Sequence, residues 1–249
     1  MVQVRRYNSL QEMVGVGKMS KIIHTFQTQY ELVSLLSKSI AMKLETAIRT
    51  KGKANLIVSG GSTPLALFRE LREISLEWEK VNIGLCDERW ISPSHEESNE
   101  NLVKNHLLQG KASRARFIGM YNEYLDIYSA EKCCTQKIKE TLFPFDVVVL
   151  GMGNDGHTAS LFPNNTELKK AFDLNNKELC IAIEPKTASY KRMSLTLSAI
   201  LSAQHIYLHF EGKEKTAVYK TANRGKNIYT MPIRAVLNQD IRDLEVYYT

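Results

Sequence analysis

A glycine-rich segment near the middle of the chain places an aspartate and a histidine two residues apart. Glycines at 151, 153 and 156 surround Asp155 and His157 in the string GMGNDGHTASLFP, residues 151–163. Histidine has an ordinary pKa that suits proton transfer near neutral pH. A glycine turn with a hydrogen-bonded structural histidine is the alternative, but the length of the string favours a catalytic loop with His157 as its acid or base.

The residues just before this loop predict a buried strand. Residues 146–150, DVVVL, contain four consecutive apolar residues, of which the first three are β-branched valines. Ligands of open α/β sheets bind just beyond the carboxyl ends of the strands. We therefore expect His157 to lie on the ligand side of a sheet.

A second glycine loop has the features of an anion site. The string SGGSTP, residues 59–64, follows an apolar strand at 56–58. Either Ser62 or Thr63 can cap a helix that starts at Pro64. Free backbone N–H groups and the dipole of that helix would then face an anion. The loop lacks the Gly-Lys-Ser/Thr of a Walker loop and the spacing of a dinucleotide fingerprint. A purely structural helix cap remains open; the candidate phosphate cradle consists of Gly60, Gly61, Ser62 and Thr63.

Charged residues follow three other predicted strands. Asp87 and Arg89 come directly after a strand at 81–86, and Arg192 and Lys215 follow strands at 180–183 and 205–210, each before a helix. Cations gathered at strand ends would suit a phosphate. Each of these charges taken alone is also explained as solvated surface. His205 and His209 lie within a strand pattern and are expected to be packed or edge residues.

Composition limits the class of protein. The chain has 249 residues, 43% of them hydrophobic, and a net charge of +6 with acids and bases interleaved, so no segment resembles a nucleic-acid arm. The four cysteines form no Cys-x-x-Cys pair, which favours reduced thiols in a cytoplasmic protein. No stretch approaches the roughly 20 apolar residues that span a membrane.

Strand and helix patterns alternate along most of the chain. This order predicts one α/β domain with a mainly parallel, doubly wound sheet flanked by helices. Helices are expected at 30–49, 64–74, 99–108, 126–142 and 213–222, and a last strand at 244–248. Residues 1–18 show no apolar period, which favours either an N-terminal extension open to disorder or a natural start at Met19. We place the domain at 19–249.

Three strings in this order resemble one family, the 6-phosphogluconolactonases, which are related to the glucosamine-6-phosphate isomerases/deaminases. They are residues 59–64, the run Asp87-Glu88-Arg89-Trp90 and residues 151–163; Ser98-Asn99, residues 192–196 and residues 212–217 match more weakly. The resemblance covers about residues 19 to 245. It implies a modified Rossmann-like α/β domain that hydrolyses 6-phospho-D-glucono-1,5-lactone in the oxidative pentose phosphate pathway, with no metal or organic cofactor.

The resemblance also implies roles for the residues already singled out. His157 resembles the family's general base, and Asp155 either orients it or is structural. Arg89 is a candidate to bind the developing negative charge or the sugar oxygens, and Asp87 is a candidate to accept hydrogen bonds from the sugar hydroxyls. Gly61, Ser62 and Thr63 are expected to bind the 6-phosphate, with Arg192 and Lys215. No Gly-x-Ser-x-Gly elbow occurs, which argues against a serine acyl-enzyme. We expect a cytoplasmic monomer or homodimer acting on a small sugar-phosphate lactone, with no nucleic-acid or membrane partner.

Two other functions deserve comparison. The isomerase/deaminase branch of the family carries a glutamate seven residues after the loop aspartate, where this chain has Phe162, and a tyrosine where this chain has Arg89 and Trp90. Both departures favour the lactonase. A non-catalytic sugar-phosphate sensor of a transcription regulator would need a DNA-binding segment, and residues 1–18 are too short for a helix-turn-helix.

Overall fold

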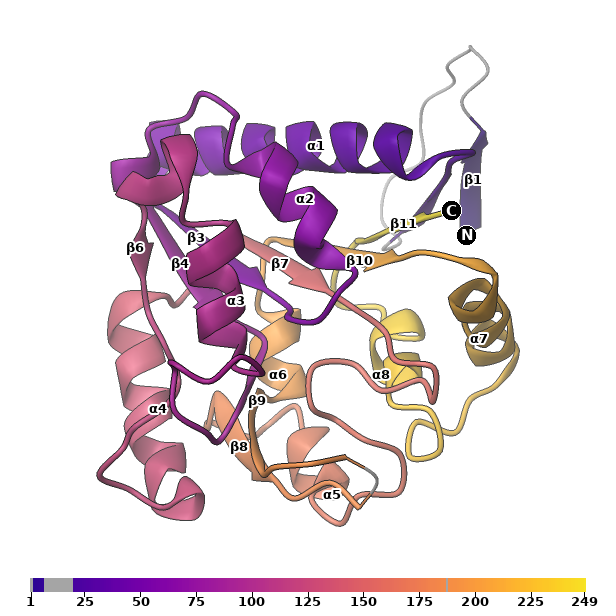
Figure 1. Ribbon diagram of the computed structural model, residues 1–249. Coiled ribbons are helices and arrows are strands. Elements are labelled where there is room, and N and C mark those ends of the chain that lie inside the picture. Colours follow the sequence, from indigo (N-terminus) through magenta and orange to yellow (C-terminus); the bar gives the residue numbers. More distant parts are fainter. Residues whose placement is uncertain (1, 7–19, 187) are drawn as a thin grey trace.

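An eight-stranded, wholly parallel sheet organises the chain (Figure 1). The computed structural model describes residues 2–6, 20–186 and 188–249. The strand order is β1-β2-β11-β10-β7-β3-β4-β6. The strands are β1 (Val2–Arg6), β2 (Lys21–Thr25), β3 (Ala54–Val58), β4 (Val81–Leu85), β6 (Arg116–Phe117), β7 (Val147–Leu150), β10 (His205–Phe210) and β11 (Leu244–Tyr248). The predicted mainly parallel sheet is confirmed.

Helices cover this sheet on both sides. In Figure 1, α1 runs above the strands, while α4, α6 and α8 lie below them. Strands β3 and β7 are buried over their whole length because helices cover both faces. The helices are α1 (Gln29–Lys51), α2 (Pro64–Leu71), α3 (Asn99–His106), α4 (Ile127–Thr141), α5 (Leu168–Ala171), α6 (Leu197–Leu201), α7 (Lys213–Arg224) and α8 (Ile233–Leu237), with 3-10 turns at Trp78–Lys80 and Gly110–Arg114.

A second, antiparallel sheet of three strands lies beside the first. Its order is β5 (Asp87–Arg89), β9 (Arg192–Leu195) and β8 (Cys180–Ile183). Strands β5 and β9 were not predicted from the sequence, and Arg192, predicted to lie between a strand and a helix, instead begins β9 opposite Arg89. The three charged residues of β5 carry no apolar alternation, so its pairing is decided by tertiary contacts.

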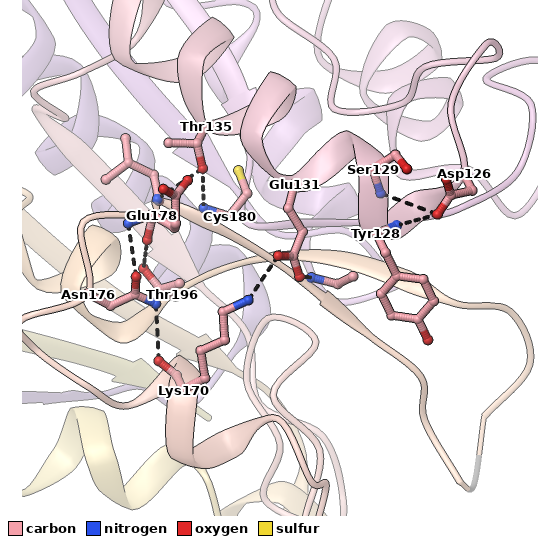
Figure 2. A network of polar contacts seen from close by, with 12 residues as sticks. Asp126, Tyr128, Ser129, Glu131, Thr135, Lys170, Asn176, Glu178, Cys180 and Thr196 are labelled. Carbon is pink, nitrogen blue, oxygen red and sulfur yellow. Dashed lines mark hydrogen bonds and ion pairs between the residues drawn. The ribbon is translucent and has the colours of Figure 1, made fainter.

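Side chains of α4 cover the edge of the small sheet (Figure 2). Thr135 Oγ1 accepts the backbone N–H groups of Leu179 at 3.2 Å and Cys180 at 3.1 Å. The Glu131 carboxylate accepts the N–H of Ala182 at 2.8 Å and pairs with Lys170 at 2.9 Å. These acceptors satisfy amide groups that an uncovered edge strand would leave without partners.

The first residues of the chain add an edge to the main sheet. Val2–Arg6 form β1, which pairs in parallel with β2 from Val2 opposite Lys21 to Arg6 opposite Thr25. The sequence analysis did not expect this strand within its extension over residues 1–18. The rest of that prediction falls on residues 1 and 7–18, which lie outside the described residues. Among the helices described, none is long and apolar enough to cross a membrane.

Candidate active site

A cavity of about 460 Å³ opens at the carboxyl ends of β3 and β7. The chain runs from β3 to β4 on one side and from β7 toward β10 on the other, so the cavity lies at the switch point of the sheet. Ser59 joins the two loops there, because its Oγ accepts the N–H of Gly151 at 3.1 Å. All of the predicted site residues line this cavity except Asp155.

His157 and Asp155 form a close pair at the cavity. His157 Nδ1 lies 2.6 Å from Asp155 Oδ1, and the same oxygen accepts the backbone N–H of His157 at 3.0 Å. An ionised carboxylate can only accept, so Nδ1 carries the proton that lies between the two side chains. Partial burial opposes ionisation of Asp155, but the hydrogen bonds and charge of His157 outweigh it and lower the pKa of the carboxyl. The pair therefore fixes the ring so that, whenever the imidazole is neutral, Nε2 is its basic nitrogen.

Two neighbours restrict the His157 ring. A Cβ at Gly153 would lie 2.2 Å from two atoms of the ring, so only glycine allows this approach. Phe162 lies on another side, with ring centroids 4.6 Å apart at 34°. Phe162 is also the position at which the sequence departs from the isomerase/deaminase pattern. The imidazole is therefore held between backbone and an aromatic ring.

The loop at residues 59–63 presents an uncapped helix end to the same cavity. Thr63 is the N-cap of α2, but its side chain makes no capping hydrogen bond, contrary to the predicted role of Ser62 or Thr63. Thr63 Oγ1 instead accepts from Lys215 Nζ at 3.0 Å. Pro64 has no N–H and the Leu65 N–H donates to Ser62 O at 3.3 Å, so an anion at this helix end would bind the loop before Pro64, where Lys215 supplies a nearby cation.

Lys215 has partly buried polar neighbours that the sequence did not indicate. Burial lowers the pKa of Lys215, and the nearby Glu211 carboxylate opposes that shift. Glu211 also accepts from Gln29 Nε2 at 2.6 Å and lies 2.9 Å from His209 Nε2. His209 is packed as predicted, at 2% exposed, yet it also lines the cavity. Its position in an apolar strand pattern concealed this second property.

Asp87 and Arg89 of β5 reach the cavity from its other wall. Asp87 Oδ2 accepts from Ser160 Oγ at 2.5 Å. Arg89 Nη1 donates to Asn99 Oδ1. Ser160 and Asn99 both line the cavity and were not predicted as site residues. Ser160 belongs to the string at residues 151–163, and Asn99 to the pair Ser98-Asn99, which matches the family more weakly. The sequence does not indicate that Ser160 contacts Asp87 or that Asn99 contacts Arg89.

Arg192 is the most buried of the predicted cations. It is 8% exposed, and Nη2 donates to the carbonyl of Ser189 at 3.0 Å. Within the part of the chain that the structure describes, its buried Nε has no hydrogen-bond partner. Burial and the charge of Arg89 lower the pKa of Arg192, against the pull of Asp87 and other carboxylates. A buried guanidinium with an unused donor is suited to an anionic ligand.

Side chains that commonly bind metals are the last group to consider at the site. The described residues contain no group of three or more His, Cys, Asp or Glu side chains that could hold a metal ion.

This combination of parallel sheet, switch-point cavity and loop histidine defines a known enzyme class. Residues 27–245 match the family model described as glucosamine-6-phosphate isomerases/6-phosphogluconolactonase. The chain belongs to this family. Its predicted modified Rossmann-like domain is thereby confirmed.

Relatives narrow the comparison within the family. A 6-phosphogluconolactonase of Rhizobium meliloti is 38% identical over 92% of this chain and 99% of its own length. A crystal structure of a 6-phosphogluconolactonase from Shewanella baltica has 43% identity and a TM-score of 0.88, covering 93% of this chain and 99% of that one. A monomeric glucosamine-6-phosphate deaminase, at 17% identity and a TM-score of 0.71, shares the fold. The predicted family resemblance is confirmed.

Proposed function

We propose that this chain hydrolyses 6-phospho-D-glucono-1,5-lactone to 6-phospho-D-gluconate, the lactone step of the oxidative pentose phosphate pathway. The observation that carries the proposal is the His157–Asp155 pair, in which Nε2 is the ring nitrogen left to act as a base. The same cavity is lined by the glycine loop and by cations, which suit a phosphate. The relatives named 6-phosphogluconolactonase supply the substrate class.

His157 acts as general base in this proposal. Nε2 removes a proton from water as its oxygen attacks C1 of the lactone, and the carbonyl electrons move onto oxygen. When the oxyanion collapses, the C1–O5 bond breaks and O5 takes the proton back from His157. The new carboxylic acid then ionises, so each turnover releases one proton. Asp155 orients the ring and stabilises its transient positive charge.

Asp87 and Arg89 of β5 serve the sugar end. Arg89 supplies donors to the carbonyl oxygen of C1 as negative charge develops there. Asp87, held by Ser160, accepts hydrogen bonds from sugar hydroxyls. Both side chains line the same cavity as His157, which supports this division of roles.

The glycine loop serves the phosphate end. Gly60, Gly61, Ser62 and Thr63 supply backbone N–H groups and hydroxyls at the uncapped start of α2. Lys215 stands beside Thr63, and Arg192 has a buried donor without a partner among the described residues. These features are what a dianionic phosphate needs in a partly buried site.

Proton release tests the proposal directly. Freshly prepared 6-phosphogluconolactone is added in weak buffer, and the rate is compared with spontaneous hydrolysis and with the His157→Ala variant. Enzymatic acceleration that depends on His157 supports the proposal. Release of ammonia from glucosamine 6-phosphate without lactone hydrolysis would instead assign the chain to the deaminase branch.

The cellular setting is part of the same proposal. All four cysteines are free thiols, which supports a reducing, cytoplasmic location. A monomer or homodimer without a nucleic-acid partner agrees with interleaved charges of both signs. Gel filtration and cell fractionation test these points.

A further inference from the structure

Asn99 uses both ends of its side-chain amide at the cavity wall. Its Oδ1 accepts from Arg89 Nη1, and its Nδ2 donates to the backbone carbonyl of Asp87 at 2.8 Å. The residue is 2% exposed and lines the cavity. A buried amide with both groups satisfied by one neighbouring strand has a fixed position and orientation.

The orientation of that amide follows from its partners. The Asp87 carbonyl is an acceptor and must face Nδ2, so Oδ1 must face the guanidinium of Arg89. The backbone N–H of Asn99 donates to the buried Glu88 carboxylate at 2.8 Å, which fixes the start of α3 against β5. The Asn99 side chain therefore holds Arg89, while Glu88 holds the Asn99 backbone.

Asn99 also lies directly against the phosphate loop. A Cβ added at Gly60 would come within 1.9 Å of Asn99 Oδ1 and 2.2 Å of its Cγ. No side chain fits between them, so the amide and the loop backbone are in direct contact. The Asn99 amide therefore contacts both the loop backbone and Arg89.

Arg89 needs such a restraint because it faces another cation. Arg89 and Arg192 are opposite each other in the β5–β9 pairing. Their like charges repel, and this repulsion adds to burial in lowering the pKa of Arg192. An amide oxygen bound to Arg89 offsets the repulsion without adding a charge to the cavity.

We infer that Asn99 is a positioning residue for the reaction, which holds the Arg89 guanidinium at the cavity wall in the orientation the lactone carbonyl requires. The inference rests on the proposed function, because Arg89 is given its role there. Asn99 itself does not touch the reacting atoms in this scheme; it acts through Arg89.

A double-mutant cycle tests whether Asn99 acts through Arg89. The lactonase rate is measured for wild type, Arg89→Ala, Asn99→Ala and the double variant. We expect each single change to lower kcat about tenfold or more with KM within threefold, because a transition-state contact is lost. In the Arg89→Ala background, Asn99→Ala should then change kcat less than threefold. Asn105→Ala, an exposed amide on the same helix, serves as the control and should match wild type.

Three kinetic outcomes contradict the inference. Asn99→Ala within twofold of wild type, or losses that multiply in the double variant, would show that Asn99 does not act through Arg89. An unaffected Arg89→Ala enzyme would remove the role of Arg89 and the inference with it. If Asn99→Ala does not fold, Asn99→Leu replaces it, since leucine keeps the approximate shape of asparagine but has no group that accepts from Arg89.

A spectroscopic readout separates this inference from the proposed function. The Arg89 Nε–Hε signal, assigned by its loss in Arg89→Ala, should shift or broaden in Asn99→Ala and stay unchanged in Asn105→Ala. An unchanged signal in Asn99→Ala overturns the inference. Wild-type protein that fails to hydrolyse the lactone would overturn the proposed function, while this signal would still decide whether Asn99 holds Arg89.

Discussion

Nδ1 of His157 lies 2.6 Å from Oδ1 of Asp155, a residue only two positions earlier in the same loop. The pair therefore needs no second element to bring it together, and one loop carries both the proposed base and the carboxylate proposed to orient it. Gly153 lets the loop fold back far enough for the ring to rest on its backbone. Changes at His157 and at Asp155 should therefore have distinct effects.

Replacing His157 by alanine should remove the general base. We expect kcat for the phosphorylated lactone to fall about 10²- to 10⁴-fold, the usual contribution of such catalysis, with little change in KM. Proton release corrected for spontaneous hydrolysis provides the measurement. His205→Ala, a half-exposed histidine at the start of β10, is the control. A His157→Ala enzyme within about threefold of wild type would rule out this role.

Asp155→Asn should lower activity and alter the pH dependence of stability. Activity should fall at least about tenfold, because the preference for the Nδ1–H tautomer is lost. The folded-state pKa of Asp155 lies below its ordinary 3.8, so its carboxylate stabilises the fold above that pH and loses this contribution as pH falls through the lowered pKa. Urea unfolding from pH 3 to 7 should show the difference between wild type and Asp155→Asn shrinking toward acid. A gap that widens toward acid would contradict the assigned sign.

Lys215→Ala and Arg192→Ala should weaken use of the phosphorylated substrate selectively. Charge-assisted hydrogen bonds contribute roughly 1.5–3 kcal/mol each, which corresponds to a loss of about tenfold or more in kcat/KM. Hydrolysis of unphosphorylated gluconolactone should change much less. Lys213→Ala, an exposed lysine in the same first turn of α7, is the matched control. Equal losses on both lactones would show that neither cation binds the phosphate.

Thr135→Val should destabilise the small sheet without touching the cavity. Valine has the same shape but leaves the N–H groups of Leu179 and Cys180 without their acceptor. An orphaned buried donor costs about 1–3 kcal/mol, so we expect the free energy of unfolding to fall by about 2 kcal/mol or more. Thr141→Val is the control, since its hydroxyl donates only to Lys137 of the same helix. Equal losses in the two variants would argue against this role of Thr135.

A chain that begins at Met19 should keep full lactonase activity. Its truncation removes β1, which pairs with β2 at the edge of the sheet, whereas the cavity is lined by residues from 58 onward. Edge strands contribute less burial than central ones, so the loss in melting temperature should be small. Activity and thermal unfolding of the two forms are compared. Failure of the shorter chain to fold would show that the first 18 residues belong to the domain.

The catalytic loop and the phosphate loop could be found from the sequence because each is local. Their glycines, the His157–Asp155 spacing and the strands before them lie within a few residues of one another, where chain connectivity alone brings the groups together. The order of strands and helices likewise predicted the parallel sheet, since hydrophobic periodicity is itself local.

Contacts between distant segments were decided only by the tertiary structure. Asn99 meets Arg89 because Glu88 binds the start of α3, and Arg192 faces Arg89 because β5 and β9 pair across about a hundred residues of chain. The sequence by itself determined the fold class, and it was enough to predict His157 as the candidate base and residues 60–63 as the candidate phosphate cradle. Which side chains hold those groups in place depended on the packing of the small sheet against α3 and α4, where burial and hydrogen-bond geometry, rather than spacing, select the partners.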